Sequence, residues 1–98
     1  MDLEILEYET CPCKFRIGFA LVRYHQLVIK CDLVYFPKGK KAWIRMPEKW
    51  FTPTKKTTFC YWPTKEISDQ FQKEVLKLIF DKYDLDEDKV AALHGKNV

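Results

Sequence analysis

The chain has no long uninterrupted run of apolar residues. Its longest apolar stretches, near residues 27–29 and 33–36, are broken by Lys30 and Asp32. A membrane-spanning helix needs about 20 consecutive apolar residues, so none is expected here. The first residues are acidic, whereas a signal peptide begins with positive charge followed by an apolar segment. We therefore expect a cytoplasmic protein that has no membrane partner.

Glycine and proline are also scarce, at three and five of 98 residues. With 47% hydrophobic and 32% charged residues, this scarcity excludes collagen-like, low-complexity and wholly disordered chains. The length corresponds to one domain, because domains most often contain about 100 to 150 residues. We therefore expect a single domain over residues 1–98, in which residues 95–98 are disordered.

Motifs of catalysis and cofactor binding are missing as well. The chain has no glycine-rich phosphate loop and no nucleophile motif, and neither histidine has a triad partner in the sequence. Asp84, Asp86 and Asp88 match the first half of a calcium loop. The match fails because Lys89 occupies the sixth position, which must be Gly, and Gly95 the twelfth, which must be Glu. We predict that the protein is not an enzyme and uses no cofactor.

The four cysteines raise the question of a metal site. Cys11 and Cys13 could grip one soft metal ion, and Cys31 and Cys60 could complete a set of four thiolates. Structural zinc sites usually pair their ligands as C-x2-4-C, whereas Cys31 and Cys60 stand singly within expected strands. At such positions a single cysteine commonly serves as a small, buried apolar side chain. We therefore assign no metal ligand, and we expect reduced thiols before disulfides.

Residues 2–62 alternate apolar and polar positions between turn signals, which is the pattern of half-buried strands. In the second strand, Phe15, Ile17, Phe19 and Leu21 share the face expected to form the core. The segment over residues 47–55 is expected to be a loop. The expected strands cover residues 3–9, 15–24, 27–36, 41–46 and 56–62.

Helices follow the strands. Thr64 is a good N-cap, and apolar residues then recur three and four positions apart from Ile67 to Ile79, which predicts an amphipathic helix over residues 65–82. Acidic residues before Val90 predict a short second helix that Gly95 ends. Strands followed by helices define the α+β class, here an antiparallel sheet of about five strands with one long helix on one face and a short C-terminal helix.

The net charge of +3 conceals an uneven distribution. Residues 38–65 contain eight basic residues and one acidic residue, and all three tryptophans lie in this segment. Cations that follow phosphates and aromatic rings that stack on bases are what a nucleic-acid binder needs. The alternative is that the aromatic residues fill the core while the lysines form an ordinary solvated face.

We predict a nucleic-acid-binding protein that grips the phosphate backbone with a basic, aromatic-rich hairpin and loop. Among the aromatic residues we expect Phe59 and Tyr61 in the core and Trp62 on the surface. The alternative is a protein-interaction or homo-oligomeric assembly module. The acidic helix and N-terminal strand favour it, because acidic side chains repel the phosphates of DNA. The predicted contacts are Lys38, Lys40, Lys41, Arg45, Lys49, Trp50, Lys55, Lys56 and Trp62.

Residues 42–49 read Ala-Trp-Ile-Arg-Met-Pro-Glu-Lys. A loop with Pro53, a strand that ends before Pro63 and a long amphipathic helix come next. This order resembles the SpoVG family, the stage V sporulation protein G or septation regulators, and the likeness covers roughly residues 15–83.

The resemblance implies a small bacterial or phage-borne homodimer that pairs sheets across its two-fold axis. It also implies a regulatory protein that binds DNA rather than RNA with modest specificity. By matching position, only Lys49 and the strand end at Met46 and Pro47 correspond to the family's motif.

Overall fold

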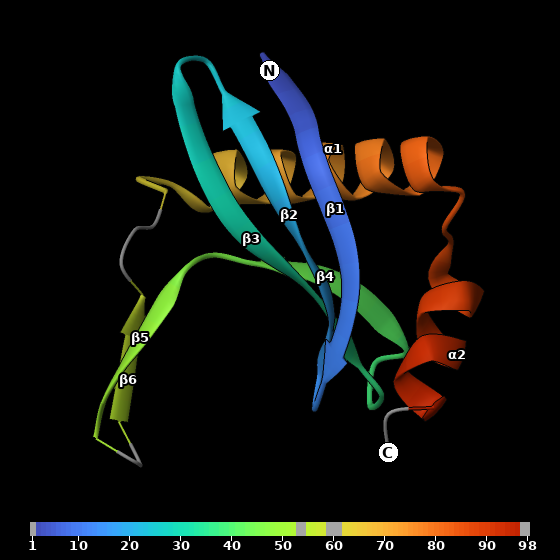
Figure 1. The fold of residues 1–98 in the computed structure, drawn as a ribbon. Helices are drawn as coiled ribbons and strands as arrows, with labels where there is room; N and C mark the ends of the chain where they lie inside the picture. The colour runs from blue at the N-terminus through green and yellow to red at the C-terminus, as the bar shows by residue number, and fades with distance from the viewer. Residues whose placement is uncertain (1, 53–54, 59–61, 97–98) are drawn as a thin grey trace.

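The computed structural model describes residues 2–52, 55–58 and 62–96 and has the expected α+β architecture (Figure 1). Four antiparallel strands form one sheet in the order β1-β2-β3-β4, and two further strands, β5 and β6, form a separate hairpin. The elements are β1 (Leu3–Cys13), β2 (Arg16–Tyr24), β3 (Leu27–Phe36), β4 (Lys41–Arg45), β5 (Glu48–Thr52), β6 (Lys55–Thr58), α1 (Lys65–Tyr83) and α2 (Glu87–Lys96).

The β5–β6 hairpin replaces the loop and the fifth sheet strand that we expected over residues 47–62. Glu48 pairs with Thr58 and Lys49 with Thr57, so residues 48–52 and 55–58 pair with each other instead of joining the sheet. The segment is rich in threonine and aromatic residues, which favour strands, so a short hairpin is compatible with its composition. Phe59 and Tyr61, predicted to be core residues, lie outside the described residues.

A bulge in β2 reverses the face that we expected to be buried. Arg16 pairs with Val34 but Gly18 pairs with the preceding residue of β3, Leu33, which leaves Ile17 as an extra residue. The extra residue shifts the alternation by one position after Ile17. The side chain of Ala20 therefore faces the core, whereas those of the residues before and after it do not. Phe19 and Leu21, predicted to be core residues, are only partly buried and lie on the opposite face.

Both helices pack against the same face of the sheet. In Figure 1, α1 crosses behind the four strands and α2 lies beside their lower part. A single cluster of buried side chains joins the two layers, which confirms the expected helix on one face. The largest fully buried members are Phe71, Ile17, Leu33, Ile44, Ile79, Val22 and Val75.

The ends of α1 follow the capping signals in the sequence. The backbone N–H of Ile67 donates to Oγ1 of Thr64 at 3.3 Å, as expected of an N-cap. Asp84 closes the helix in a left-handed conformation with φ of 53°. No helix within the described ranges is both long and apolar enough to cross a membrane.

The second helix is longer than predicted. We expected Gly95 to end it and residues 95–98 to be disordered, but α2 continues to Lys96. A single glycine weakens a helix interior by about 1 kcal/mol without stopping it. Residues 97–98 lie outside the described residues.

Side chains from the helical segment cover both edges of the sheet. Nζ of Lys82 donates to the carbonyl oxygen of Ile5 on β1 at 2.8 Å. At the other edge, the backbone N–H of Ala42 on β4 donates to Oε2 of Glu87 at 2.8 Å. These bonds satisfy edge groups that would otherwise be available to pair with another chain.

Candidate nucleic-acid interface

Two turns bring five cations to one end of the sheet. In an antiparallel meander, successive turns alternate between the two ends, so the β1–β2 and β3–β4 turns lie together and the β2–β3 turn lies opposite. The backbone N–H of Tyr35 donates to the carbonyl oxygen of Phe15 at 2.9 Å, which joins the two turn regions. We call this group the basic end: Lys14, Arg16, Lys38, Lys40 and Lys41.

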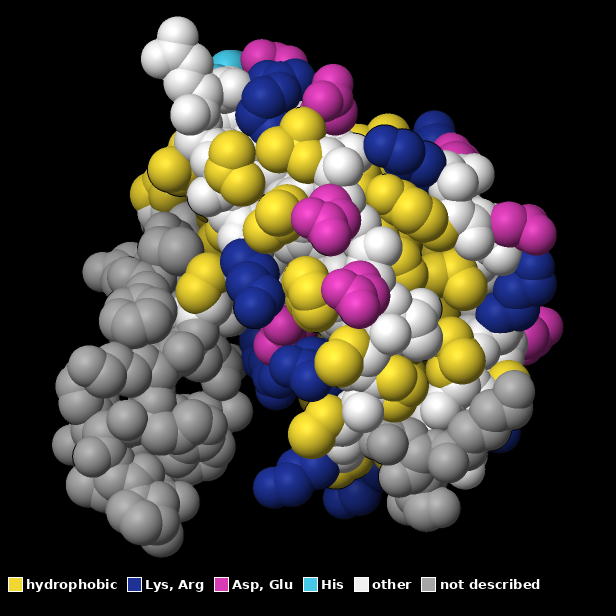
Figure 2. Space-filling view, viewed as in Figure 1, with side chains coloured by type: hydrophobic (Ala, Val, Ile, Leu, Met, Phe, Trp, Pro, Cys, Tyr) yellow, Lys and Arg dark blue, Asp and Glu magenta, His cyan; other side chains and the backbone are white. Residues whose placement is uncertain are grey.

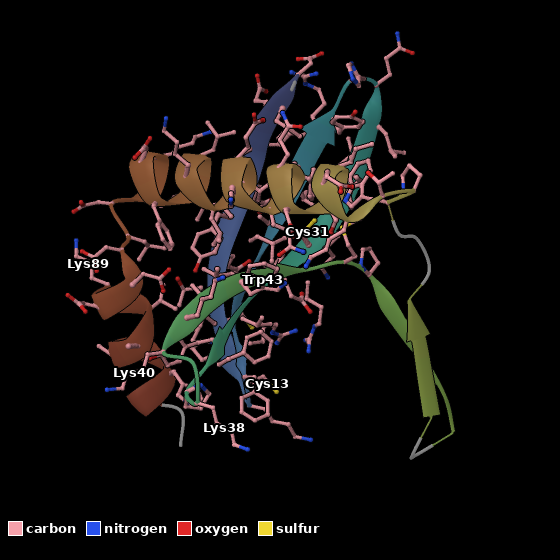
Figure 3. All side chains as sticks on the ribbon, turned by 180° about the vertical axis from the view of Figure 1, so that it is seen from behind. Cys13, Cys31, Lys38, Lys40, Trp43 and Lys89 are labelled. Atoms are coloured by element: carbon pink, nitrogen blue, oxygen red, sulfur yellow. The ribbon has the colours of Figure 1, made fainter. Side chains whose placement is uncertain are left out.

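The turns hold the basic end in a fixed backbone conformation. Lys14 and Lys40 both adopt positive φ, at 56° and 50°, as tight turns require. Lys38 and Lys40 are exposed, and Figure 3 shows them at the same end of the sheet as Cys13. The stretches 13–16 and 37–41 contain no acidic residue, so cations dominate both turns.

Lys41 and Arg45, both predicted contacts, extend from β4 and already have partners. Nζ of Lys41 lies 4.5 Å from the centroid of the Trp43 ring, a cation–π contact. A guanidinium nitrogen of Arg45 lies 3.0 Å from Oδ2 of Asp32 on β3. Both side chains would have to exchange these partners for a phosphate.

Trp62 corrects one of our predictions, because it packs against the core instead of lying on the surface. Its ring centroid is 4.8 Å from that of Phe71 and 5.3 Å from that of Tyr24. It lies just before α1, where the chain returns to the sheet, so its ring covers the edge of the core beside the first turns of the helix. Trp62 is partly buried, so these contacts reduce the ring surface that could stack on a nucleic-acid base.

The β5–β6 hairpin holds the remaining predicted contacts, and we call it the arm. Figure 1 shows the arm projecting from the sheet. In its backbone register Trp50 pairs with Lys56 and Thr52 with Lys55, and Lys49 lies opposite Thr57. Only the backbone of the arm is described, so the roles of these four predicted contacts stay predictions.

The face of the sheet opposite the helices, which we call the open face, carries charges of both signs. Cross-strand pairing places Glu9 beside Phe19, Phe19 beside Asp32 and Asp32 beside Arg45. Nζ of Lys30 lies 4.6 Å from the centroid of the Phe19 ring. Figure 2 shows hydrophobic side chains interspersed with acids and bases on this face, and so it is not a uniform basic patch.

The opposite end of the sheet is closed by a polar clamp. A guanidinium nitrogen of Arg23 lies 3.3 Å from Oδ1 of Asp2, and His25 donates its backbone N–H to the Asp2 carbonyl at 3.1 Å. The hydrogen bond and the charge of Arg23 lower the pKa of Asp2 below its ordinary value. This clamp fixes the start of β1 beside the β2–β3 turn.

The three cysteines that the structure describes lie in different environments. Cys31 is fully buried within the core, whereas Cys11 and Cys13 are exposed on β1. Cys60 lies outside the described residues. Across the part of the chain that the structure describes, no group of three or more metal-ligating side chains comes together.

Sequence reasoning missed Lys14 and Arg16. Both lie far from residues 38–65 in the sequence and were not counted with that basic segment. The signal that would have found them is the alternation of turns, because the first and third turns of a four-stranded meander share one end.

The chain was compared with protein-family models, curated proteins and solved structures, and it matches none of them.

Proposed function

We propose that this protein binds nucleic acid, with DNA favoured over RNA, and that it serves in regulation. The basic end and the arm grip the phosphate backbone. The observation that supports this most is the gathering of five cations on two turns that carry no acidic residue. The sheet fixes the backbone of the turns, so binding to phosphates costs the entropy of the lysine side chains but little backbone entropy.

The strength of such binding must depend on salt. Each phosphate contact releases a counterion, and log K falls with log salt by about 0.7 per contact for single strands and about 0.9 for duplex. If six cations of the basic end and the arm make contact, the expected slope is roughly −4 to −5 for single strands and −5 to −6 for duplex.

The test compares two double variants that remove the same charge. Lys38→Gln/Lys40→Gln removes two exposed cations of the basic end, and Lys73→Gln/Lys77→Gln removes two exposed cations of α1. Fluorescence anisotropy with labelled single- and double-stranded oligonucleotides over a salt series gives both slopes. The first variant should reduce the slope by about 1.4 for single strands and about 1.8 for duplex, and the second should leave it unchanged. A flat salt response, or equal losses in both variants, contradicts the proposal.

Base stacking on the arm is a separate part of the proposal. Trp50→Ala should cost roughly 1 to 3 kcal/mol in single-strand affinity if a base stacks on this ring. The Lys55→Gln/Lys56→Gln variant should instead weaken single strands and duplex alike, because it removes phosphate contacts. Unchanged single-strand affinity of Trp50→Ala would remove stacking on Trp50 while leaving the electrostatic proposal intact.

The open face favours a second function, homo-oligomeric assembly, which would engage Lys41 and Arg45 in place of phosphates. Acids line the β1 side of this face, at Glu4, Glu7 and Glu9, and bases line the β4 side, at Lys41 and Arg45. A two-fold axis that runs between the two sheets and parallel to their strands would place the acidic side of one copy over the basic side of the other, so we propose a homodimer. This charge pattern, rather than the amount of exposed apolar surface, favours a second copy as the partner.

Light scattering after size exclusion tests the dimer. The wild-type chain should have the mass of a dimer, and Glu7→Lys/Glu9→Lys should have the mass of a monomer because like charges would then face each other. A monomeric wild type contradicts the dimer without affecting the oligonucleotide titrations. A dimer that ignores oligonucleotides at low salt would instead select the assembly module as the function.

A further inference from the structure

Cys11 and Cys13 lie beside Arg16 of the basic end, at the hairpin end of β1 and β2, and the proposed function uses neither thiol. Both thiols are free and exposed. Arg16 pairs directly with Cys13 across the strands. Its guanidinium donates from Nε to the Cys11 carbonyl oxygen at 3.1 Å and contacts Sγ of Cys11 through Nη2 at 3.6 Å. One cation therefore lies beside both cysteines.

Arg16 brings the two cysteines into one neighbourhood. The β1–β2 pairing is irregular between Thr10 and Cys13, so regular alternation does not establish their proximity. Their proximity follows from the Arg16 side chain, which reaches Sγ of Cys11 from the position opposite Cys13. Pro12, between them, has no backbone N–H and is tolerated here because β1 is an edge strand.

The two thiols could be joined by a disulfide or by a metal ion. The β1–β2 pairing is irregular between Thr10 and Cys13, so regular strand spacing does not fix the separation of Cys11 and Cys13. A disulfide prefers Cα atoms about 5.5 to 6 Å apart. A metal ion with two bonds of about 2.3 Å lets the sulfur atoms remain as much as about 4.6 Å apart. A metal ion therefore tolerates a wider range of backbone geometry at this irregular site.

The number of ligands available at the site then indicates which metal ion it would bind. Thiolates select soft ions such as Cu(I) and zinc, and structural zinc requires four ligands. Within the described ranges no third ligand stands near this pair, and Cys31 is enclosed in the core. A cuprous ion can be held by two thiolates alone. The complex then carries one net negative charge, which the guanidinium of Arg16 offsets.

We propose that Cys11 and Cys13 form a two-thiolate site for one cuprous ion per chain, with Arg16 as the positioning residue. On binding, each thiol loses a proton to solvent and forms one Cu–S bond, and the oxidation state of the metal does not change. The site lies on the hairpin end of the sheet, and its occupancy can be measured without any nucleic acid. Its test is therefore independent of the function proposed above.

The experiment titrates the reduced full-length chain anaerobically with Cu(I) in competition with a chromogenic cuprous chelator. The wild type should bind one Cu(I) per chain. Cys11→Ser and Cys13→Ser should each lose this binding, whereas Cys60→Ser should retain it, because the two thiolates of Cys11 and Cys13 hold the ion; loss of binding in Cys60→Ser would overturn the two-thiolate site. Circular dichroism of each variant shows whether it is folded, so a loss of binding can be separated from a loss of structure.

Arg16 provides the second measurement. Arg16→Gln should keep the stoichiometry and weaken Cu(I) binding by about 10- to 100-fold, the usual effect of losing a group that supports a metal ligand. Arg16→Lys, which keeps the charge, should recover part of that loss. Unchanged affinity in Arg16→Gln overturns the role of Arg16.

Three further results would overturn the site itself. The first is binding that persists in both serine variants. The second is one metal ion per two chains, which indicates four thiolates shared between copies. The third is a loss of two hydrogens in the mass of the air-exposed chain together with no binding by the reduced chain, which indicates a disulfide pair.

Discussion

The two faces of the four-stranded sheet differ although they are built from the same strands. On the covered face Val22, Leu33 and Ile44 are at most 1% exposed and belong to the buried cluster that joins the sheet to the helices. On the open face Val28 and Phe36 are 52% and 46% exposed, and charged side chains lie between apolar ones. The covered face accounts for the folding of the chain, and the open face with the basic end offers groups to a partner.

One residue departs from this division. Val34 lies on the open face, where it pairs with Arg16 and Trp43, yet it is fully buried. Its neighbours are long side chains, whose apolar portions cover it while their charged or polar ends reach water. Side chains of the open face therefore pack against one another near the basic end, and elsewhere on this face they are more exposed.

The largest expected difference between the faces comes from removing one aromatic ring on each side. Phe71→Ala should lower the free energy of unfolding by about 3 to 5 kcal/mol, because the ring is fully buried and leaves a cavity. Phe19→Ala, on the open face, should cost clearly less, since that ring is only partly buried. Denaturant titrations of both variants give the comparison. Equal losses would mean that the open face contributes to stability as much as the core.

Gly18 marks the place where the bulge brings β1 and β2 close together. A Cβ at Gly18 would collide with the carbonyl oxygen of Glu9 and lie 2.8 Å from the Tyr8 hydroxyl. Gly18→Ala should therefore destabilise the chain by about 1 to 3 kcal/mol, the usual cost of overpacking. Gly95→Ala is the matched control, because nothing lies within 4 Å of its Cβ position. It should be neutral or stabilise α2 by up to about 1 kcal/mol. Denaturant titrations that rank the two variants equally would contradict the close approach at the bulge.

Local patterns predicted the elements whose signals are contained in a short stretch of chain. The bounds of β3, the capping of α1 by Thr64 and the burial of Ala42 and Ile44 follow from alternation and capping chemistry. The buried face of β2 could not be predicted in this way. It depends on Ile17 being an extra residue opposite β3, and no property of Ile17 itself indicates a bulge.

The candidate site was predictable only where its residues are close in sequence. Lys38, Lys40 and Lys41 form one turn, and their exposure follows from the turn chemistry. Arg16 joins them because of the strand order, and Trp62 packs against the edge of the core because α1 returns across the sheet. Both facts are consequences of tertiary structure that the spacing of residues within one segment does not contain.

Tyr8 allows a smaller test of the covered face through pH. Burial raises the pKa of Tyr8 above its ordinary value of 10.0, and the hydrogen bond that Thr10 donates to its hydroxyl opposes this. The folded chain holds the phenol proton more tightly than the unfolded chain does. Stability should therefore be complete below pH 10 and fall as the pH rises through the folded pKa. Unfolding free energies measured from pH 8 to 11 should show this decline in the wild type and a weaker one in Tyr8→Phe.

Thr10→Val serves as the control for that measurement. It removes the hydrogen bond that lowers the pKa of Tyr8, so the decline should extend to higher pH than in the wild type. Identical profiles for the wild type and Tyr8→Phe would mean that another group causes the alkaline loss of stability.

The smallest expected effect concerns the ion pair between Arg45 and Asp32 on the open face. Their side chains are 34% and 28% exposed, so water screens much of the attraction. A double-mutant cycle with Arg45→Met and Asp32→Asn should give a coupling of about 0.2 to 1 kcal/mol in the free energy of unfolding.

The same double-mutant cycle can be measured by oligonucleotide affinity, which tests whether Arg45 contacts a phosphate. If Arg45 exchanges Asp32 for a phosphate, Asp32→Asn should strengthen binding in the presence of Arg45 and have no effect in its absence. An Asp32→Asn variant that binds more tightly in both backgrounds would instead show that Asp32 repels the phosphates directly, and that Arg45 is not a contact.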